Sequence, residues 1–327
     1  MKLLIIGGTR FVGRAITDCA LQRGHEITLF HRGHSNNDLF DVEQIFGDRD
    51  GETDKLAGRE WDAVIDTCGY HPRVVEQSAD TLCDNVGLYC FISTISVYAD
   101  DNQRPVSEAG KLIRFAEPPK SEEVTGETYG GFKVLCEETI NHVLGGEKAL
   151  HIRPGLIIGP HDTTDRFTYW VDRFSRDGEV LVPDRAQQPI QFIDVRDLAD
   201  FTVRMVEQGS TGVFNADGPA HDIRMGEVWS VLKDNCGGLP KEVIVSDQFL
   251  KDHEVKDWQD LPFVTPKDDD ITIVDVTKAI DCGLTLRPLR ETVVDTAEWH
   301  KNRGEIELKT GMSRQREREL LAEWKSR

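Results

Sequence analysis

Short runs of apolar residues alternate with helix-like segments through the first half of the chain. The apolar runs predict strands at residues 3–6, 26–30, 61–67, 87–94 and 149–153. Helix-like spacing predicts three helices. The first ends near residues 23–25, the second covers 74–83 and the third covers 129–144. Near-continuous apolar strands that alternate with helices are typical of a parallel sheet covered on both faces. We therefore predict a Rossmann-type, doubly wound α/β fold for this part of the chain.

A glycine-rich turn follows the first predicted strand. Its sequence is Gly7-Gly8-Thr9-Arg10-Phe11-Val12-Gly13, and a predicted helix continues from it. Gly7 and Gly8 allow a tight turn, and Gly13 allows the helix to pack closely on the strand. Free amides at the start of such a helix hold a pyrophosphate. Arg10 stands where the usual fingerprint has its second glycine, so the turn predicts dinucleotide binding with one departure from the pattern.

Glycine and proline become frequent after residue 155, and the predicted elements become less regular. Such loops usually build substrate sites. We predict a dinucleotide-binding domain over residues 1–160, to which a strand and a helix from about 190–215 return. Residues 161–327 are predicted to form mainly a smaller α/β substrate-binding lobe. This lobe includes a strand at 242–245 and ends in a charged helix at 313–324.

Charge and composition limit the classes of partner that we expect the chain to bind. The formal net charge is -19 over 327 residues, which opposes binding to nucleic acid and to anionic membranes. No apolar stretch approaches the length of a membrane helix, and the first apolar run is too short for a signal peptide. We expect a cytoplasmic protein whose partner is a small-molecule substrate, with no nucleic acid and no membrane.

Cysteine and histidine residues are scattered along the chain. The seven cysteines lack the paired spacing of a zinc or redox site, and the ten histidines form no ligand-like pattern. We expect reduced, mostly buried thiols and no metal, so that the chemistry is carried by the dinucleotide.

A tyrosine and a lysine stand four residues apart at the start of the helix predicted at 129–144. Tyr129 and Lys133 therefore share one helix face. A phenol has a pKa of about 10 and needs a nearby cation to exchange protons at neutral pH, and Lys133 can supply it. Upstream, Ser93, Thr94 and Ser96 end a predicted central strand, where a hydroxyl can polarise a substrate oxygen.

These motifs, in this order, resemble the extended short-chain dehydrogenase/reductases, the NAD-dependent epimerase/dehydratase family, along nearly the whole chain. The motifs that carry the resemblance are residues 7–13, Gly47-Asp48-Arg49, residues 93–98 and 129–133, Arg153-Pro154-Gly155 with Gly159-Pro160, and residues 192–199. The resemblance implies hydride transfer at a nicotinamide ring while a tyrosine moves the proton on the attached oxygen. Family members often form homodimers through helices that include the one beginning at Tyr129, so a homodimer is a further expectation.

The resemblance also implies roles for individual residues. Tyr129 is the general acid/base, Lys133 lowers the pKa of Tyr129 and binds the nicotinamide ribose, and Thr94 is the hydroxyl partner. Ser93 and Ser96 are alternatives to Thr94, and Asp48 would accept a hydrogen bond from the adenine amine. The expected cofactor-binding residues are Gly7, Thr9, Arg10, Phe11, Val12, Gly13, His31, Arg32, Asp48, Arg49, Thr67, Gly69, Lys133 and Pro154.

The end of the second predicted strand bears on the choice between NADP and NAD. An NAD enzyme usually has Asp or Glu there, whereas an arginine suits a 2′-phosphate. This chain has Phe30-His31-Arg32 and no acid. Arg10 and Arg32 together would clamp a phosphate, so NADP is predicted. NAD is the alternative if Arg10 stacks or forms an internal ion pair.

The substrate loops depart from those of the nucleotide-sugar epimerases. Ile190 stands about where some of them have an arginine that grips the diphosphate, which disfavours a nucleotide-diphosphate substrate. The lack of an Asp-Glu pair around Thr94 favours a reductase or epimerase, acting on a small, sugar-like substrate, over a dehydratase. Candidate polar contacts, or alternatively solvated loop residues, are His161, Asp162, Arg166 and Arg185.

The N-terminal motifs also resemble a branch that includes chloroplast stem-loop RNA-binding proteins. A second hypothesis is therefore a Rossmann protein that binds RNA or senses a cofactor without turnover. Those relatives tend to lose the catalytic tyrosine, whereas Tyr129 and Lys133 are both present here. The charge of -19 offers no obvious phosphate-binding face. These features favour an enzyme.

Overall fold

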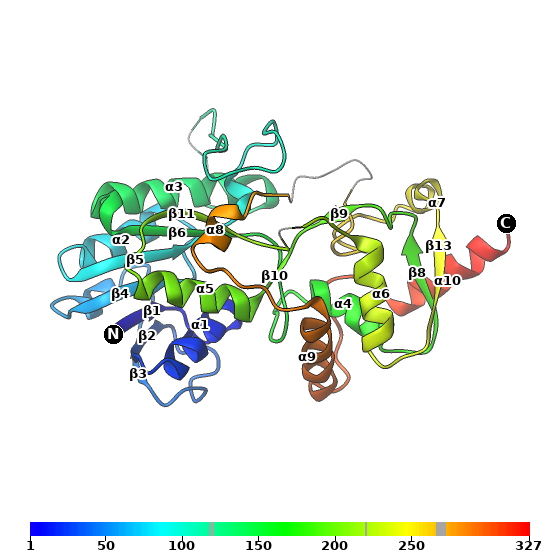
Figure 1. Ribbon diagram of the computed structural model, residues 1–327, viewed down its shortest axis with the longest axis horizontal. Helices are drawn as coiled ribbons and strands as arrows, with labels where there is room; N and C mark the ends of the chain where they lie inside the picture. The colour runs from blue at the N-terminus through cyan, green and yellow to red at the C-terminus, as the bar shows by residue number, and fades with distance from the viewer. Residues whose placement is uncertain (118, 120, 220, 266–272) are drawn as a thin grey trace. The chain divides into compact units, whose positions relative to one another are not determined.

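The chain forms two compact units, each with its own packed interior (Figure 1). The computed structural model describes residues 1–117, 119, 121–219, 221–265 and 273–327. Unit 1 comprises Met1–Leu156, Val195–Ala220 and Val274–Thr285, and unit 2 comprises Ile157–Asp194, His221–Ile273 and Leu286–Arg327. The return of the third segment to unit 1 was not anticipated from the sequence.

Unit 1 is built on a seven-stranded sheet with the order β11-β6-β5-β4-β1-β2-β3. Every neighbouring pair in this sheet is parallel, which confirms the predicted Rossmann-type α/β fold. The strands are β1 (Lys2–Ile6), β2 (Glu26–His31), β3 (Glu43–Phe46), β4 (Trp61–Asp66), β5 (Val86–Ile92), β6 (Ala149–Pro154) and β11 (Gly212–Ala216). The sequence pattern did not predict β3.

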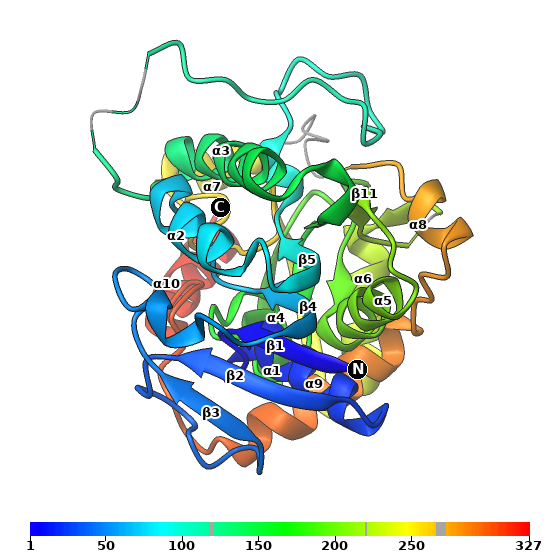
Figure 2. The same cartoon turned by 90° about the vertical axis from the view of Figure 1, so that its left-hand side faces the viewer.

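Helices cover the sheet of unit 1, with α1 packed against α5 and α2 packed against α3 (Figure 2). The α-helices are α1 (Phe11–Gln22), α2 (Pro72–Leu82), α3 (Gly126–Leu144), α5 (Val195–Glu207) and α8 (Thr277–Asp281). Three short 3₁₀ turns are η1 (Thr53–Leu56), η2 (Ile95–Val97) and η3 (Gly146–Lys148). Helix α2 shows why the sequence folds this way, since its buried residues Val74, Val75, Ala79 and Leu82 recur at helical spacing.

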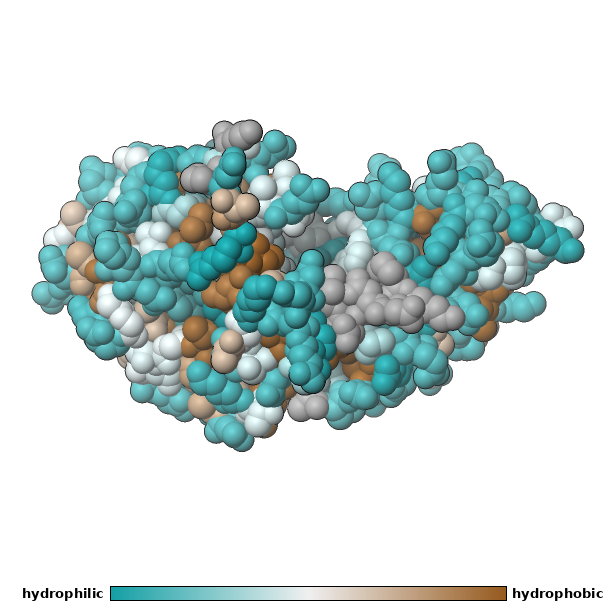
Figure 3. Space-filling view, turned by 90° about the horizontal axis from the view of Figure 1, so that it is seen from above, coloured by the Kyte–Doolittle hydropathy of each residue, from teal (hydrophilic) through white to brown (hydrophobic). Residues whose placement is uncertain are grey.

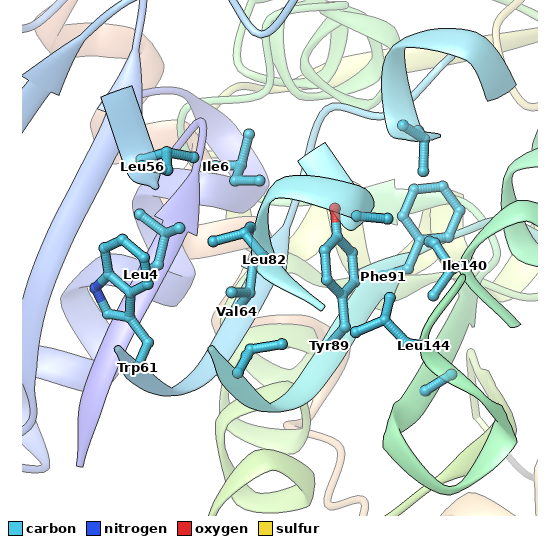
Figure 4. Close-up of a cluster of buried hydrophobic side chains, with 14 of the residues drawn as sticks. Leu4, Ile6, Leu56, Trp61, Val64, Leu82, Tyr89, Phe91, Ile140 and Leu144 are labelled. Carbon is cyan, nitrogen blue, oxygen red and sulfur yellow. The ribbon is translucent and has the colours of Figure 1, made fainter. Parts of the chain in front are cut away.

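A hydrophobic cluster fills the space between the strands and α2 and α3 (Figure 4). The strands contribute side chains that are almost fully buried, and the two helices cover them. Members of the cluster include Leu4, Ile6, Val64, Tyr89 and Phe91 from strands, Leu82 from α2, and Ile140 and Leu144 from α3. Burial of this surface is the main stabilising contribution to the sheet and holds the carboxyl ends of its strands in place.

Unit 2 combines short parallel and antiparallel strand pairs with five helices in its described part. The strand pairs are β7 (Ile157–Ile158) with β10 (Ile193–Asp194), β9 (Pro189–Ile190) with β12 (Ile223–Arg224), and β8 (Gly178–Pro183) with β13 (Pro240–Val245). The helices are α4 (Arg166–Phe174), α6 (Met225–Asn235), α7 (Asp247–Asp252), α9 (Leu289–Asn302) and α10 (Arg314–Lys325). The strand predicted at 242–245 lies in β13, and the predicted charged helix is α10.

The surface agrees with the acidic, polar composition. Hydrophilic residues make up most of the face drawn in Figure 3. Over the residues that the structure describes, no helix is both long and apolar enough to span a lipid bilayer. All seven cysteines are free, but only Cys90, Cys136 and Cys236 are buried and the other four are partly exposed, which corrects the expectation that most would be buried.

Candidate active site

After two neighbouring parallel strands at the centre of the sheet, the chain turns to opposite sides of the sheet. Strand β1 continues through α1 to β2, whereas the adjacent β4 continues through α2 to β5 on the other side. A parallel sheet has a crevice beyond the carboxyl ends of its strands at such a point, and ligands bind there. The glycine turn of residues 7–13 follows β1, and Thr67 and Gly69 follow β4.

The glycine turn has the geometry that a pyrophosphate requires. Gly7 and Gly8 have φ of 101° and 92°, a region that other residues rarely adopt. A Cβ on Gly13 would lie 2.6 Å from the backbone nitrogen of Gly8, so only glycine permits this approach of helix and turn. Helix α1 starts after Arg10 with no side-chain cap and no acid in its first turn. Its first amides and its dipole are therefore available to an anion.

The loop after β2 is attached to the glycine turn. The side-chain amide of Asn36 donates to the carbonyl oxygen of Thr9 at 2.9 Å, and His31 at the end of β2 contacts Gln44 Oε1 through Nε2 at 2.9 Å. Arg10 and Arg32 are exposed on these two joined segments. Among the described residues, neither guanidinium has a hydrogen bond or an ion-pair partner, so both are available to a ligand.

Arg49 lies inside unit 1 and contacts a neighbouring strand. Its guanidinium donates to both carboxylate oxygens of Asp66, at 2.7 and 2.8 Å, and to Ser78 Oγ at 2.7 Å. Burial alone would raise the pKa of the Asp66 carboxyl, but Arg49 outweighs it and the pKa lies below its usual value. The contact between Arg49 and the cofactor stays a prediction. Asp48 is half-buried beside it, and its Oδ1 accepts from the amide of Asp50 at 3.0 Å.

Lys133 is held at the carboxyl ends of β4 and β5. Its ammonium donates to the carbonyl oxygens of Gly69, at 2.8 Å, and Ile92, at 2.7 Å. Burial lowers the pKa of Lys133 to about 8 because an apolar environment disfavours the charged form. The nitrogen also lies 3.9 Å from the centroid of the Phe91 ring. A cation is thus anchored in the crevice, one helical turn from Tyr129.

Tyr129 is half-buried in the first turn of α3. Its ring centroid lies 6.4 Å from that of Tyr70, and the Lys133 nitrogen lies 5.6 Å from the Tyr70 centroid. Tyr70 follows β4 and its side chain is 46% exposed. Sequence reasoning did not single out Tyr70, because an aromatic residue in a loop has no pattern that marks it.

Thr94 is buried at the end of β5 and caps η2. Its Oγ1 accepts a hydrogen bond from the amide of Ser96 at 3.1 Å and lies 3.2 Å from Ser96 Oγ. Helix α3 contacts this turn through Gly130, where a Cβ would lie 2.0 Å from the carbonyl oxygen of Ser96. Thr94 and Tyr129 therefore lie on two segments in direct contact. Two adjacent glycines inside a predicted helix are the signal that marks such a close approach.

Pro154 ends β6, next to β5, and is buried. The preceding Arg153 donates to both oxygens of Glu137 in α3, at 2.9 and 2.6 Å, and to the hydroxyl of Tyr98 at 3.0 Å. Strand β6 and helix α3, which carry expected site residues, are thereby joined by a buried ion pair.

The polar loop residues noted in unit 2 mostly have structural partners. Arg185 is 6% exposed and pairs with Asp247 and Asp257, each at 2.8 Å. Asp162 is 1% exposed and accepts from the amide of Thr164 at 2.8 Å. Neither is a solvated loop residue. His161 lies 5.3 Å from the ring of Trp299, and Arg166 donates to Thr164 Oγ1 at 3.1 Å.

The fold and this arrangement of residues agree with the comparison of the chain with protein families. The model of the NAD dependent epimerase/dehydratase family matches residues 3–216. The chain belongs to this family. The match runs from β1 to the end of β11 and so includes every strand of the parallel sheet, as the resemblance of the sequence motifs indicated.

Individual members and solved structures resemble the chain to different extents. The chloroplast stem-loop binding protein of 41 kDa b from Arabidopsis thaliana is 27% identical over 263 residues, which span 75% of this chain and 65% of that protein. The Bordetella bronchiseptica enzyme WbmH, solved with NAD+, is 18% identical with a TM-score of 0.70 over 93% of this chain and 99% of its own. UDP-N-acetylglucosamine 4-epimerase from Bacillus cereus is 17% identical with a TM-score of 0.67, over 94% and 99%. At these identities the two structures establish the shared fold.

Proposed function

We propose that the chain is an NAD(P)-dependent reductase or epimerase of the extended short-chain dehydrogenase/reductase type, acting on a hydroxyl or carbonyl of a small, sugar-like substrate. The observation that carries the proposal is the position of Lys133. Its buried ammonium donates to the carbonyl oxygens of Gly69 and Ile92, and among the described residues no carboxylate forms an ion pair with it. One turn from Tyr129, it favours the phenolate that acid–base catalysis requires.

Some of the site residues are proposed to bind the cofactor, and others to transfer the proton. A bound nicotinamide supplies hydride transfer. Tyr129 moves the proton on the substrate oxygen, Lys133 lowers the pKa of Tyr129 and contacts the nicotinamide ribose, and Thr94 polarises the same oxygen. The residues proposed to contact the cofactor are Gly7, Thr9, Phe11, Val12, Gly13, His31, Asp48, Thr67, Gly69 and Pro154, with Arg10 and Arg32. Arg49 supports them by holding Asp66 at the end of β4.

The cofactor is proposed to be NADP rather than NAD. Exposed guanidinium groups at Arg10 and Arg32 lie on segments joined by the bond between Asn36 and Thr9, and the end of β2 has no acid to bind a 2′-hydroxyl. Calorimetric titration of the purified protein with NADPH and NADH tests both the site and the preference. Micromolar binding with tighter NADPH supports the proposal, tighter NADH contradicts the NADP preference, and binding of neither contradicts the enzyme.

One feature supports a substrate other than a nucleotide diphosphate. Ile190 is buried in β9 at 3% exposure, so no cation stands where some epimerases grip the diphosphate. Sugar alcohols and small carbonyl compounds are therefore the first substrates to screen with NADPH. The homodimer expected from the family is proposed to form through two helices of unit 1 that include α3, and sedimentation of the purified protein tests it.

RNA binding is the second candidate function. It is favoured by the 27% identity to a protein named for stem-loop binding, and it is opposed by the net charge of -19. Electrophoretic mobility of a labelled RNA hairpin, with and without the protein, separates the two functions. A shift that persists at physiological salt, together with no binding of NADPH or NADH, would replace the enzyme with an RNA-binding protein.

A further inference from the structure

A cavity in unit 2 is lined by more basic than acidic residues, although the chain as a whole is acidic. It has a volume of about 620 Å³, within the range of small-molecule sites. Residues at the end of α4, at the start of β8 and along α10 line it, and Figure 1 labels these three elements. Its lining residues are Arg173, Arg176, Asp177, Gly178, Glu179, Arg314, Glu317, Arg318, Leu321, Ala322 and Lys325.

Cations outnumber acids in this lining. Five of the eleven residues are Arg or Lys and three are Asp or Glu, whereas acids exceed basic residues by 19 over the whole chain. Cations that lie close together repel one another, and a bound anion would offset that repulsion. The lining therefore carries a net charge opposite in sign to that of the whole chain.

The carboxylates near the cavity are already shared among several cations. Asp172 in α4 contacts Arg176 at 2.6 Å, His300 at 3.0 Å and Arg314 at 3.4 Å. Burial would raise the pKa of Asp172, but hydrogen bonds from His300 and Arg176 outweigh it and the pKa lies below its usual value. Asp172 is ionised at neutral pH, yet one negative charge cannot neutralise its partners.

Two of the three acids of the lining are also engaged by cations. Glu317 pairs with Arg173 at 2.5 Å and accepts from the amide of Leu181 at 2.9 Å. Glu179 pairs with Lys325. One donor is left over, because the Nε of Arg173, a residue that is 8% exposed, has no hydrogen-bond partner among the described residues.

Arg318 is the cation with the least compensation. Its Nε donates to the carbonyl oxygen of Arg314 at 3.3 Å, and within the described ranges it forms no ion pair. Arg314 and Arg318 are four residues apart on one helix face, where like charges repel. An anion between the two guanidinium groups would replace this repulsion with two charge-assisted contacts.

We propose that this cavity binds a phosphate-bearing small molecule, with Arg314 and Arg318 contacting the phosphate. Planar guanidinium groups match phosphate oxygens in pairs, and Leu321 and Ala322 offer an apolar wall to the rest of the ligand. The site lies wholly in unit 2, separate from the crevice that Tyr129 and Lys133 occupy in unit 1. It is therefore a second ligand site, independent of the nicotinamide chemistry proposed above.

Calorimetric titration with inorganic pyrophosphate at low salt tests the proposal, in the presence of saturating NADPH so that the glycine turn is filled. The variant is Arg318→Gln. The matched control is Arg316→Gln, because Arg316 lies on the same helix but donates to the carbonyl oxygen of His253 at 2.9 Å and does not line the cavity. Thermal unfolding of both variants checks that they fold.

Loss of a charge-assisted contact predicts that Arg318→Gln weakens pyrophosphate binding by about tenfold or more, while Arg316→Gln binds as the unchanged protein does. Equal weakening in the two variants, or no pyrophosphate binding by the unchanged protein, would overturn the proposal. Binding of an RNA hairpin that Arg318→Gln abolishes, without pyrophosphate binding, would overturn it in favour of RNA. If the protein binds no NADPH, the titration is run without it, so failure of the proposed function does not decide the result.

Discussion

Gly130 of α3 lies against the carbonyl oxygen of Ser96, so close that a Cβ would be 2.0 Å from that oxygen. This contact brings the start of the helix, with Tyr129, against the η2 turn that Thr94 caps. The spacing between the proposed proton-transfer residue and its hydroxyl partner therefore depends on the absence of one side chain.

Replacement of this glycine by alanine is expected to separate the two segments. Gly130→Ala should destabilise the protein by about 1–3 kcal/mol, as overpacking against backbone does, and should lower turnover. Gly126→Ala, in the first turn of the same helix, is the control because its Cβ would meet nothing within 4 Å. It should stabilise by about 0.5 kcal/mol. Urea unfolding of both variants measures the difference, and equal effects would contradict the close contact.

Removal of the Tyr129 hydroxyl is expected to stop catalysis without loss of the cofactor. Tyr129→Phe should lower kcat about 100-fold or more, because general acid–base catalysis contributes at least this factor, while NADPH affinity stays nearly the same. Tyr70→Phe, which changes a neighbouring tyrosine, should keep most of its turnover. Steady-state kinetics and calorimetry give both quantities. Unchanged turnover in Tyr129→Phe would remove this residue from the mechanism.

If the two exposed arginines bind a 2′-phosphate, their removal should lower the affinity for NADP more than the affinity for NAD. Arg10→Ala and Arg32→Ala should each weaken NADP about tenfold or more, since a charge-assisted contact to phosphate is lost, and should weaken NAD much less. Titration of each variant with both dinucleotides measures the ratio. An equal loss for NADP and NAD would exclude a 2′-phosphate clamp.

The lowered pKa of Lys133 leads us to expect opposite effects of pH on the free energy of unfolding and on turnover. Its pKa is about 8 in the folded protein, below the usual value of 10.5. Between these values the unfolded chain binds a proton that the folded one does not, so the free energy of unfolding should rise with pH, by up to about 3 kcal/mol. Turnover should fall over the same range because the neutral amine no longer stabilises the phenolate.

Lys133→Met provides the control for this pH dependence. The variant keeps an apolar chain of similar length without a titrating group, so its unfolding free energy should lack the additional rise above pH 8. Urea unfolding of both proteins at several pH values between 7 and 10 measures the difference. Parallel curves for the two proteins would show that Lys133 does not titrate in this range.

The ion pair between Arg153 and Glu137 is expected to be important for stability. Both side chains are buried, so Glu137→Ala leaves an unpaired charge and should cost about 3–5 kcal/mol. Glu138→Ala is the matched control, because the next residue of α3 pairs with Arg114 at the surface and should cost less than about 1 kcal/mol. A similar loss in the two variants would contradict a special role for the buried pair.

The strands of the central sheet were predictable because each buried strand is a nearly continuous apolar run, as in β1 and β5. Strand β3 was not predicted because it lacks such an apolar run. It lies at the sheet edge, has four residues and contains no buried one, so its sequence has no apolar pattern to recognise. Local periodicity reports burial, and an edge strand with little burial leaves no such signal.

The sequence by itself determined the class of fold, the glycine turn and the presence of Tyr129 and Lys133 on one helix, because each depends on residues close together in the chain. Only the tertiary structure decided the partners of Arg49 and Arg185. Asp66 is 17 residues from Arg49, and Asp257 is 72 residues from Arg185. Many acids along the chain are equally able to pair with an arginine, and packing of the apolar elements selects which of them it meets.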